Sequence, residues 1–219
     1  MTGKETPMSD SSRTPIIGPV DFTMMYAAHD AFSRDLRRLT EACAAGEAMS
    51  TPVRARWATF KNQLHIHHTA EDVALWPPLR AKLTSASEDA VLDEMEIEHG
   101  ELEPLLERID TSLGARDPVT VADTVRALTA GLTAHMGHEE EAALPLVATH
   151  LGPEGWQAFA GHFRKTQGLR GAPEFFPWLL DGASEATQTR VLELLPPPVR
   201  LLYRRVWAPR YDRRSRRTT

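Results

Sequence analysis

The chain has 219 residues, 42% of them hydrophobic, which is enough to bury one core or one core with a small appendage. Its single cysteine excludes an intramolecular disulfide and requires no oxidising compartment, and the polar N-terminus and the lack of a long apolar run predict neither a secretory leader nor a membrane span. The net charge of −5 combines −12 over residues 1–199 with +7 over residues 200–219. An acidic body argues against a nucleic-acid partner. We therefore expect a cytoplasmic protein that binds neither nucleic acid nor a membrane.

Residues 1–20 are rich in Ser, Thr, Pro and Gly, and we expect this N-terminal segment to be disordered. From Asp21 onward the apolar residues recur at intervals of three and four, which predicts amphipathic helices. Thr51-Pro52 and Asp117-Pro118 are typical of an N-cap followed by proline, and Ser85 with Glu88 resembles a capping box. Four helices are expected, over about residues 21–46, 51–76, 85–113 and 117–145.

The sequence contains an internal repeat. HHTAEDVALWP at residues 67–77 matches HMGHEEEAALP at residues 135–145 after a shift of 68 residues. A shift of 70 residues lays the first predicted helix on the third with every inward position apolar or histidine. Two related helical hairpins with short connections predict an all-α, up-down-up-down antiparallel four-helix bundle over residues 21–150.

Six side chains on the inward faces form a candidate metal site: His29, His67, Glu71, His99, His135 and Glu139. In each HxxxE pair the two residues lie on one face of a helix, about 6 Å apart along its axis. Imidazole nitrogens and carboxylate oxygens together suit iron, manganese or zinc better than calcium. If both glutamates bridge two metals, each metal receives two histidines and keeps about one open position in octahedral geometry. The alternative is a polar core network without metal.

The other histidines give weaker signals. His68 and Asp72 lie one residue round the helix from the proposed ligands, and we interpret them as a solvated pair. Glu103, four residues after His99, is a reserve ligand, although its counterpart under the 70-residue shift is Ser33. Surface or otherwise satisfied positions are expected for His65, His138, His150 and His162.

This set of residues resembles the hemerythrin-like family, often called the HHE cation-binding domain. The resemblance rests on His29, on the two repeated stretches and on IEHGEL around His99, and it covers roughly residues 21–150. It implies a non-haem di-iron centre, in which two iron ions bridged by carboxylates and an oxo or hydroxo group react with dioxygen, peroxide or nitric oxide. The four histidines are then terminal ligands, and Glu71 and Glu139 are bridges.

The chain departs from the oxygen-carrying members of that family. Met95 stands where they carry a second histidine one turn before the one matched by His99, so five histidines become four. Their last carboxylate is an aspartate five residues after its histidine, whereas Glu139 lies four residues after His135. These differences predict a symmetric site with both irons open, which suits the turnover of peroxide better than the storage of oxygen.

Three further side chains are expected to line the pocket of the centre. Met95, and Met25 opposite it, are interpreted as a pliable wall rather than as ligands of ferric iron. Tyr26, three residues before His29, could hydrogen-bond a bound oxygen species or, less readily, ligate iron; an ordinary position on the flank of the helix is the alternative.

Residues 151–219 are expected to form a helical extension packed on the bundle and ending in a basic tail, because they have too many prolines and aromatic residues for a free tail and too few apolar residues for a domain. The aromatic residues could shield the site, dock a protein partner or simply pack.

Three functions therefore stay open. The first is a di-iron protein that binds or turns over dioxygen, peroxide or nitric oxide, most concretely by peroxide disproportionation in oxidative-stress defence. The second is a non-enzymatic sensor that signals through residues 151–219, and the third is a structural helical module with one zinc or none. Whether the protein is an enzyme is left open, because the metal would carry the redox chemistry and no catalytic residue is predicted beyond it.

Overall fold

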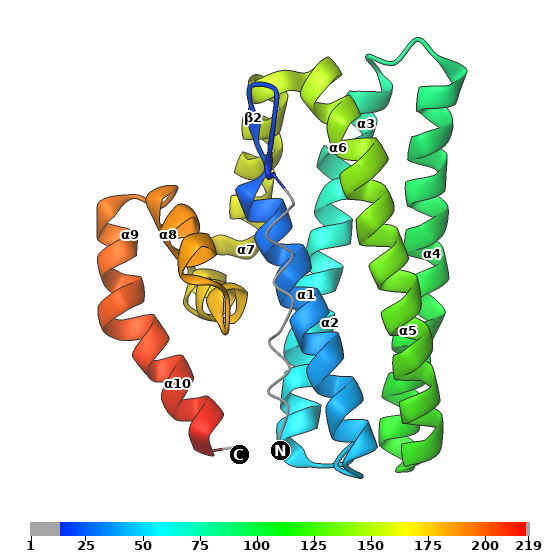
Figure 1. The fold of residues 1–219 in the computed structure, drawn as a ribbon, viewed down its shortest axis with the longest axis vertical. Helices are drawn as coiled ribbons and strands as arrows, with labels where there is room; N and C mark the ends of the chain where they lie inside the picture. Colours follow the sequence, from blue (N-terminus) through cyan, green and yellow to red (C-terminus); the bar gives the residue numbers. More distant parts are fainter. Residues whose placement is uncertain (1–13, 218–219) are drawn as a thin grey trace, which may run out of the picture.

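The computed structural model describes residues 14–217 and is an all-α helical bundle, as the sequence predicts (Figure 1). Its four long helices lie side by side: α1 (Thr23–Ala44), α2 (Thr51–Ala74), α4 (Ala86–Ala115) and α5 (Pro118–His138). A short helix, α3 (Trp76–Arg80), leads from α2 towards α4. The connections alternate between the lower and upper ends of the bundle in Figure 1, so consecutive long helices run in opposite directions.

Two of the three predicted helix starts form with local capping bonds. Asp117 accepts hydrogen bonds from the backbone N–H groups of Val119 and Thr120, directly before Pro118. In α2 the cap is Ser50 rather than the expected Thr51, because the Ser50 hydroxyl accepts from the Val53 N–H. The expected capping box at Ser85 is not formed: Ser85 makes no side-chain cap bond, and its hydroxyl meets that of Ser87.

The interior is divided into two apolar clusters along the bundle axis. The upper cluster includes Phe22, Met25, Leu75, Trp76, Met95 and Leu144, and the lower cluster includes Phe32, Phe60, Leu64, Leu102, Leu128 and Leu132. On α1 and on α4 a single histidine separates the two clusters: His29 lies between Met25 and Phe32, and His99 between Met95 and Leu102. The candidate ligands therefore occupy one polar layer between two apolar layers.

The N-terminal expectation needs a correction. Residues 14–20, expected to be disordered, contain a small antiparallel hairpin of β1 (Ile16–Ile17) and β2 (Val20–Asp21). Val20 is buried in the upper cluster, and the Phe22 N–H donates to the Pro15 carbonyl at 2.6 Å, so apolar burial and backbone pairing hold this segment. Residues 1–13 lie outside the described residues.

After α5 the helical path continues through a π-helical turn, η1 (Glu139–Ala143), then α6 (Leu144–Leu146) and a second π-helical turn, η2 (Val147–Leu151). Gly152, at φ 62° and ψ −165°, then reverses the chain into α7 (Gly152–Leu180), a conformation that favours glycine. The remaining segments are α8 (Glu185–Glu193), α9 (Pro197–Leu202), η3 (Tyr203–Trp207) and α10 (Ala208–Arg217).

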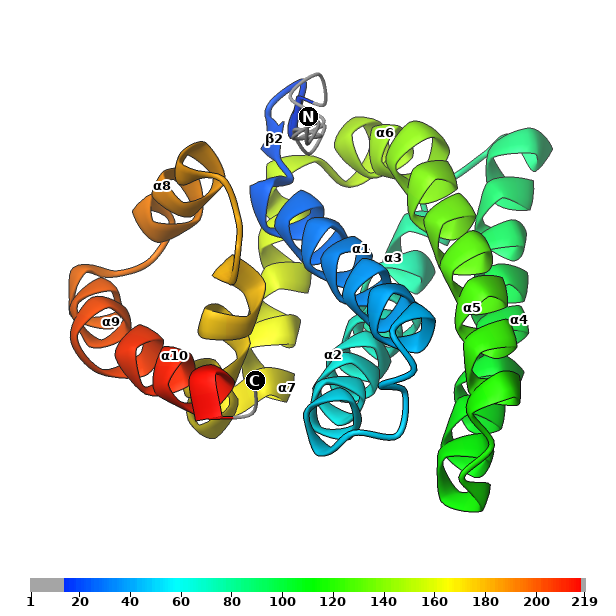
Figure 2. The same cartoon turned by 60° about the horizontal axis from the view of Figure 1, so that its bottom comes forward.

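The segments after α6 form a layer beside α1 and α2 (Figure 2). Trp178 of α7 is buried in the lower cluster, where its ring lies 5.2 Å from that of Phe32 and its indole N–H donates to Asp35 at 2.8 Å. Arg34 and Arg38 of α1 donate to the Asp181 backbone carbonyl and carboxylate at 2.7 and 2.5 Å. Apolar burial and ionic hydrogen bonds thus both join this layer to the bundle.

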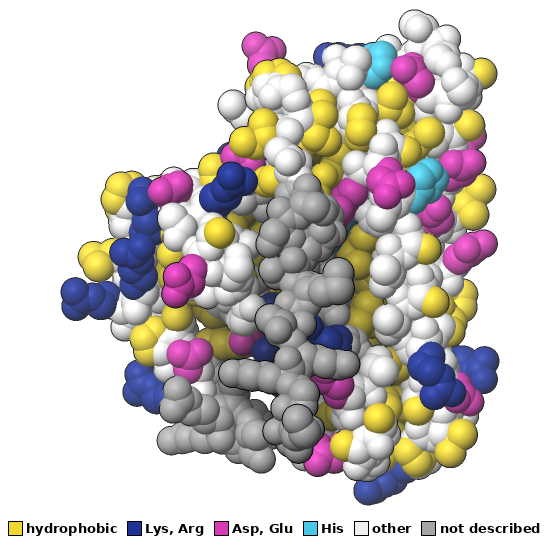
Figure 3. Space-filling view, viewed as in Figure 1, with side chains coloured by type: hydrophobic (Ala, Val, Ile, Leu, Met, Phe, Trp, Pro, Cys, Tyr) yellow, Lys and Arg dark blue, Asp and Glu magenta, His cyan; other side chains and the backbone are white. Residues whose placement is uncertain are grey.

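The outer side of this layer is basic and partly apolar. Figure 3 shows basic side chains, all of them arginines, along the edge formed by the last helices, while acidic side chains are spread over the bundle. Leu201 and Leu202 are exposed beside these arginines. Among the described helices, none combines the length and apolar character needed to cross a bilayer.

We expect Trp178→Ala to lower the free energy of unfolding by about 3–5 kcal/mol, because it removes a fully buried indole and leaves Asp35 Oδ2 without the indole N–H donor. Urea or thermal unfolding measures the loss. Leu201→Ala, whose side chain is 59% exposed, is the control and should change stability by less than about 0.5 kcal/mol. Equal effects of the two substitutions would contradict the described packing of α7.

Candidate metal centre

The six predicted ligands meet in the polar layer of the bundle. All are buried, with exposed fractions from 0% for Glu71 and Glu139 to 8% for His99. They come from α1, α2, α4 and the junction between α5 and η1. Residues separated by as many as 110 positions in the chain are therefore brought together, as the repeat predicts.

Most of the donor atoms in this layer fall into two groups. Within each group the ligand atoms lie within 4.8 Å of one another: the His99 group contains His68, His99 and His135, and the His29 group contains His29, His67 and Glu139. Glu71 faces both groups, because its Oε1 lies 3.0 Å from His67 Nε2 and its Oε2 lies 3.6 Å from His99 Nε2. One carboxylate between two ligand groups is the arrangement needed to bridge two metal ions.

Outer carboxylates fix the orientation of three of the imidazoles. The Nδ1 atoms of His29, His99 and His135 lie 2.8, 2.9 and 2.8 Å from carboxylate oxygens of Glu140, Asp72 and Glu98, respectively. A neutral imidazole that donates from Nδ1 has a lone pair at Nε2, and this is how metal-binding histidines are usually held. Nε2 of His99 is only 3.1 Å from Nε2 of His135. Two facing lone pairs at that distance repel each other unless a proton or a metal ion lies between them.

The spacing of the donor atoms fits a six-coordinate metal. His29 Nε2 and Glu139 Oε2 are 3.0 Å apart, and so are His67 Nε2 and Glu71 Oε1. Neighbouring ligands with bonds of about 2.1 Å lie about 3.0 Å apart in an octahedron and about 3.4 Å apart in a tetrahedron. Neither oxygen of Glu71 has a hydrogen-bond partner within residues 14–217. These buried oxygens and imidazoles thus fit metal ions with mixed nitrogen and oxygen ligands, and the two 3.0 Å pairs have the spacing of neighbouring octahedral ligands.

The electrostatics agree with a site built for cations. Burial lowers the pKa of His67 to about 3, so this imidazole is neutral and free to donate its lone pair. Burial and the neighbouring Glu139 raise the pKa of Glu71 well above its ordinary value. Glu139 differs, because the facing imidazoles overcome its burial and lower its pKa to about 2. His29 pairs with it: burial lowers the pKa of His29, but Glu139 and Glu140 outweigh that effect and raise it to about 9.

Several expectations for neighbouring residues change. His68, interpreted as half of a solvated pair with Asp72, instead has a buried Nε2 in the His99 group, and Asp72 binds His99. Glu103 is exposed on α4 and belongs to neither group, so its place as reserve ligand is withdrawn. His138, in contrast, meets its expectation as a satisfied histidine: it is partly buried, and its Nδ1 lies 2.8 Å from Glu98 Oε1.

Met25 and Met95 are buried in the upper cluster, next to the polar layer, where they form part of its apolar wall.

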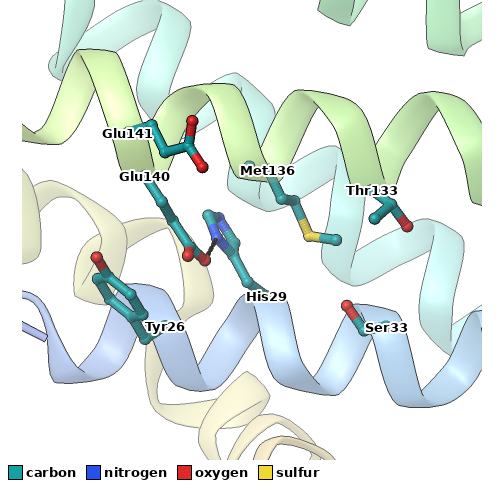
Figure 4. Close-up of a pocket in the computed structure, with 8 residues that line it drawn as sticks. Tyr26, His29, Ser33, Thr133, Met136, Glu140 and Glu141 are labelled. Atoms are coloured by element: carbon teal, nitrogen blue, oxygen red, sulfur yellow. Dashed lines mark hydrogen bonds and ion pairs between the residues drawn. The ribbon is translucent and has the colours of Figure 1, made fainter. Parts of the chain in front are cut away.

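Tyr26 is partly buried and lines a pocket between α1 and α5 (Figure 4). The pocket also contains Ser33, Thr133 and Met136, and His29 lies at its wall with Nδ1 bonded to Glu140. It therefore borders the His29 group and contains no residue of the His99 group.

The outer carboxylates of the repeat were missed from the sequence, although the repeat contains a signal for them. Asp72 and Glu140 correspond under the 68-residue shift, and His99 and His29 correspond under the 70-residue shift. Each carboxylate holds the histidine of the other hairpin. At Glu140 the π-helical turn η1 contributes, because a wider turn lets the adjacent Glu139 and Glu140 both be buried.

The profile of the hemerythrin HHE cation binding domain matches residues 20–147. The chain belongs to this family. The match spans the four helices of the bundle and the residues of both candidate ligand groups, so the chain contains a metal-binding helical domain. No characterised protein and no solved structure matches the chain significantly.

We expect Glu71→Gln to separate metal binding from folding. Because the pKa of Glu71 is raised, ionisation of this carboxyl destabilises the fold. The destabilisation is absent in acid and grows as the pH rises above 4.5, the ordinary pKa of a glutamate. At neutral pH the metal-free Glu71→Gln protein should therefore be at least as stable as the parent. The parent should gain about 4 kcal/mol from Fe²⁺ at a thousand times its Kd, a gain that the variant loses.

Thermal unfolding with EDTA and with anaerobic Fe²⁺ measures both effects. Glu103→Gln is the matched control, because it makes the same chemical change at an exposed position and should behave as the parent in both conditions. A Glu71→Gln protein that is stabilised by Fe²⁺ as strongly as the parent would contradict the role of Glu71.

Proposed function

We propose that the protein is a non-haem di-iron protein whose activity is peroxide disproportionation. The observation that supports this most directly is Glu71, a buried carboxylate without hydrogen-bond partners in the described chain, lying between two groups of imidazoles. Nitrogen and oxygen donors in near-octahedral spacing suit iron or manganese. His29, His67, His99 and His135 would be terminal ligands, and Glu71 and Glu139 would bridge.

Bound iron would supply the electron transfer: one peroxide is oxidised to dioxygen, giving two electrons and two protons, and a second peroxide accepts them to form two waters. The residues of the chain provide the surroundings for this exchange. The two apolar clusters limit access of water to the polar layer from above and below. Access for a small polar molecule lies between α1 and α5, where the pocket reaches His29 past the Tyr26 and Ser33 side chains (Figure 4).

A specific contact favours a second function, a sensor that responds to oxygen, nitric oxide or redox state. The Phe32 ring lies 5.3 Å from the ring of His67 and 5.2 Å from that of Trp178. A proposed iron ligand is thus linked to α7 through one intervening side chain. A shift of His67 on ligand binding would displace Phe32 and, through it, the layer formed by residues 151–217. A protein partner bound to that layer would then sense the state of the centre.

For the enzymatic function, we expect purified protein to contain about two irons per chain, with a near-ultraviolet charge-transfer band, and to release oxygen from hydrogen peroxide. Glu71→Ala should lose the band and at least about a hundredfold of the rate, because a ligand to both irons is removed. Metal analysis and an oxygen electrode measure these outcomes, with Glu103→Gln as the control that retains both. Iron far below two per chain would overturn the di-iron proposal, and an oxygen release no faster than that of free iron would overturn the enzymatic one.

For the sensor function, we expect binding of nitric oxide or azide to the iron-loaded protein to change amide hydrogen exchange in residues 170–195 without turnover. Phe32→Leu should abolish this change while leaving ligand binding intact, because it removes the ring between His67 and Trp178. Phe176→Leu, an aromatic substitution on α7 with no ring contact to Phe32 among those described, is the control. Unchanged exchange in the parent on ligand binding would exclude this function.

A further inference from the structure

His68 belongs to the His99 group but has no place in the symmetric arrangement of four histidines and two bridging glutamates. Its residue as a whole is partly exposed, but its Nε2 atom is buried and has no hydrogen-bond partner in the described part of the chain. Its ring stacks on His99 at a centroid distance of 3.9 Å and an angle of 11°, and it meets His135 edge-on at 5.3 Å and 82°. A buried, unpartnered nitrogen among two other ligand nitrogens is a metal donor in position.

The repeat shows where the two halves differ. Under the 68-residue shift that pairs His67 with His135, His68 falls on Met136. Met136 lines the pocket that borders His29. The His99 group thus has a third imidazole at the place where the His29 group has a thioether and an opening towards solvent.

We propose that His68 is a fifth imidazole ligand and that the two irons are therefore unequal. The iron of the His99 group has three imidazoles, from His68, His99 and His135. The iron of the His29 group has two, and its open position faces the pocket beside Met136, so a small external ligand binds at this iron alone. This inference rests on the proposed di-iron centre and replaces the symmetric site expected from the sequence.

Simple packing of His68 against His99 is the competing explanation, and His68→Phe separates the two. Phenylalanine keeps a flat ring that can stack on His99 but has no nitrogen to donate. We expect His68→Phe to retain its helical circular dichroism and to bind one of its two irons at least about tenfold more weakly in competition with a chelator, as loss of a donor requires. His65→Phe, the same substitution at an exposed position of α2, is the matched control.

Mössbauer spectra give a readout independent of activity. The parent should show two quadrupole doublets of equal area, and His68→Phe should reduce or shift one of them. A His68→Ala protein should regain iron when free imidazole is added, because the space left by the side chain admits the same donor. Retention of both irons and of the parent spectrum in His68→Phe would show that His68 only packs and would overturn the inference while leaving the di-iron proposal intact. A parent protein without two irons would overturn both.

Azide tests the open position. Titration of the ferric protein should saturate at one azide per chain, and replacement of Met136 by Phe, which narrows the pocket beside His29, should weaken binding without removing iron. Saturation at two azides per chain would contradict a single open iron.

Discussion

The structure depends on the burial of two carboxylates, Glu71 and Glu139, among imidazoles. An ionised carboxylate without compensation in an apolar interior costs several kcal/mol. Here the two Glu71 oxygens have no hydrogen-bond partner in residues 14–217, and apolar clusters lie above and below the polar layer. One carboxylate is compensated by a protonated His29, since the pKa of His29 is raised to about 9 and that of Glu139 is lowered to about 2, but Glu71 is not. Cations bound beside Glu71 would offset this cost, so we expect metal binding to stabilise the folded bundle.

The outer carboxylates show how a repeated sequence gives a site that neither half could form alone. Asp72 of the first hairpin holds His99 of the second, and Glu140 of the second holds His29 of the first. Correct orientation of His29 and His99 therefore requires that both hairpins dock, so this part of the ligand geometry forms when the bundle assembles. The arrangement is not fully symmetric. Glu98 has Ala28 as its counterpart, and His68 has Met136, so the His99 group receives more polar support, whereas the His29 group faces a pocket.

The all-α fold and the six-residue set were predictable because both rest on periodicity. Helical spacing fixes which residues face inward, and a repeat places equivalent residues at one level of a bundle. The outer carboxylates and His68 were not predicted, because they lie about 100° round the helix from the inward stripe, where spacing alone cannot separate an inter-helix contact from solvent. Glu103 has the right spacing from His99 but is exposed and is not a ligand candidate. Spacing alone does not fix how a helix is rotated about its axis relative to the bundle interior. The wider turn at Glu139–Ala143 also has no sequence signal that we recognise.

The layer after residue 151 has a physical role that its composition alone did not specify. Trp178 and Phe175 complete the lower cluster, and Phe32 lies between Trp178 and His67. His67 has no outer carboxylate at Nδ1 among the described contacts, unlike His29, His99 and His135, so its orientation depends on the Glu71 side chain and on the aromatic rings around it. Packing of α7 thus supplies at His67 part of the positional restraint that ionic hydrogen bonds supply at the other three histidines. Such a restraint is softer than a hydrogen bond, since ring contacts tolerate small rotations. The proposed iron ligand with the softest restraint is therefore the one that contacts the extension through Phe32, and both a catalytic and a signalling role for the centre would use that freedom.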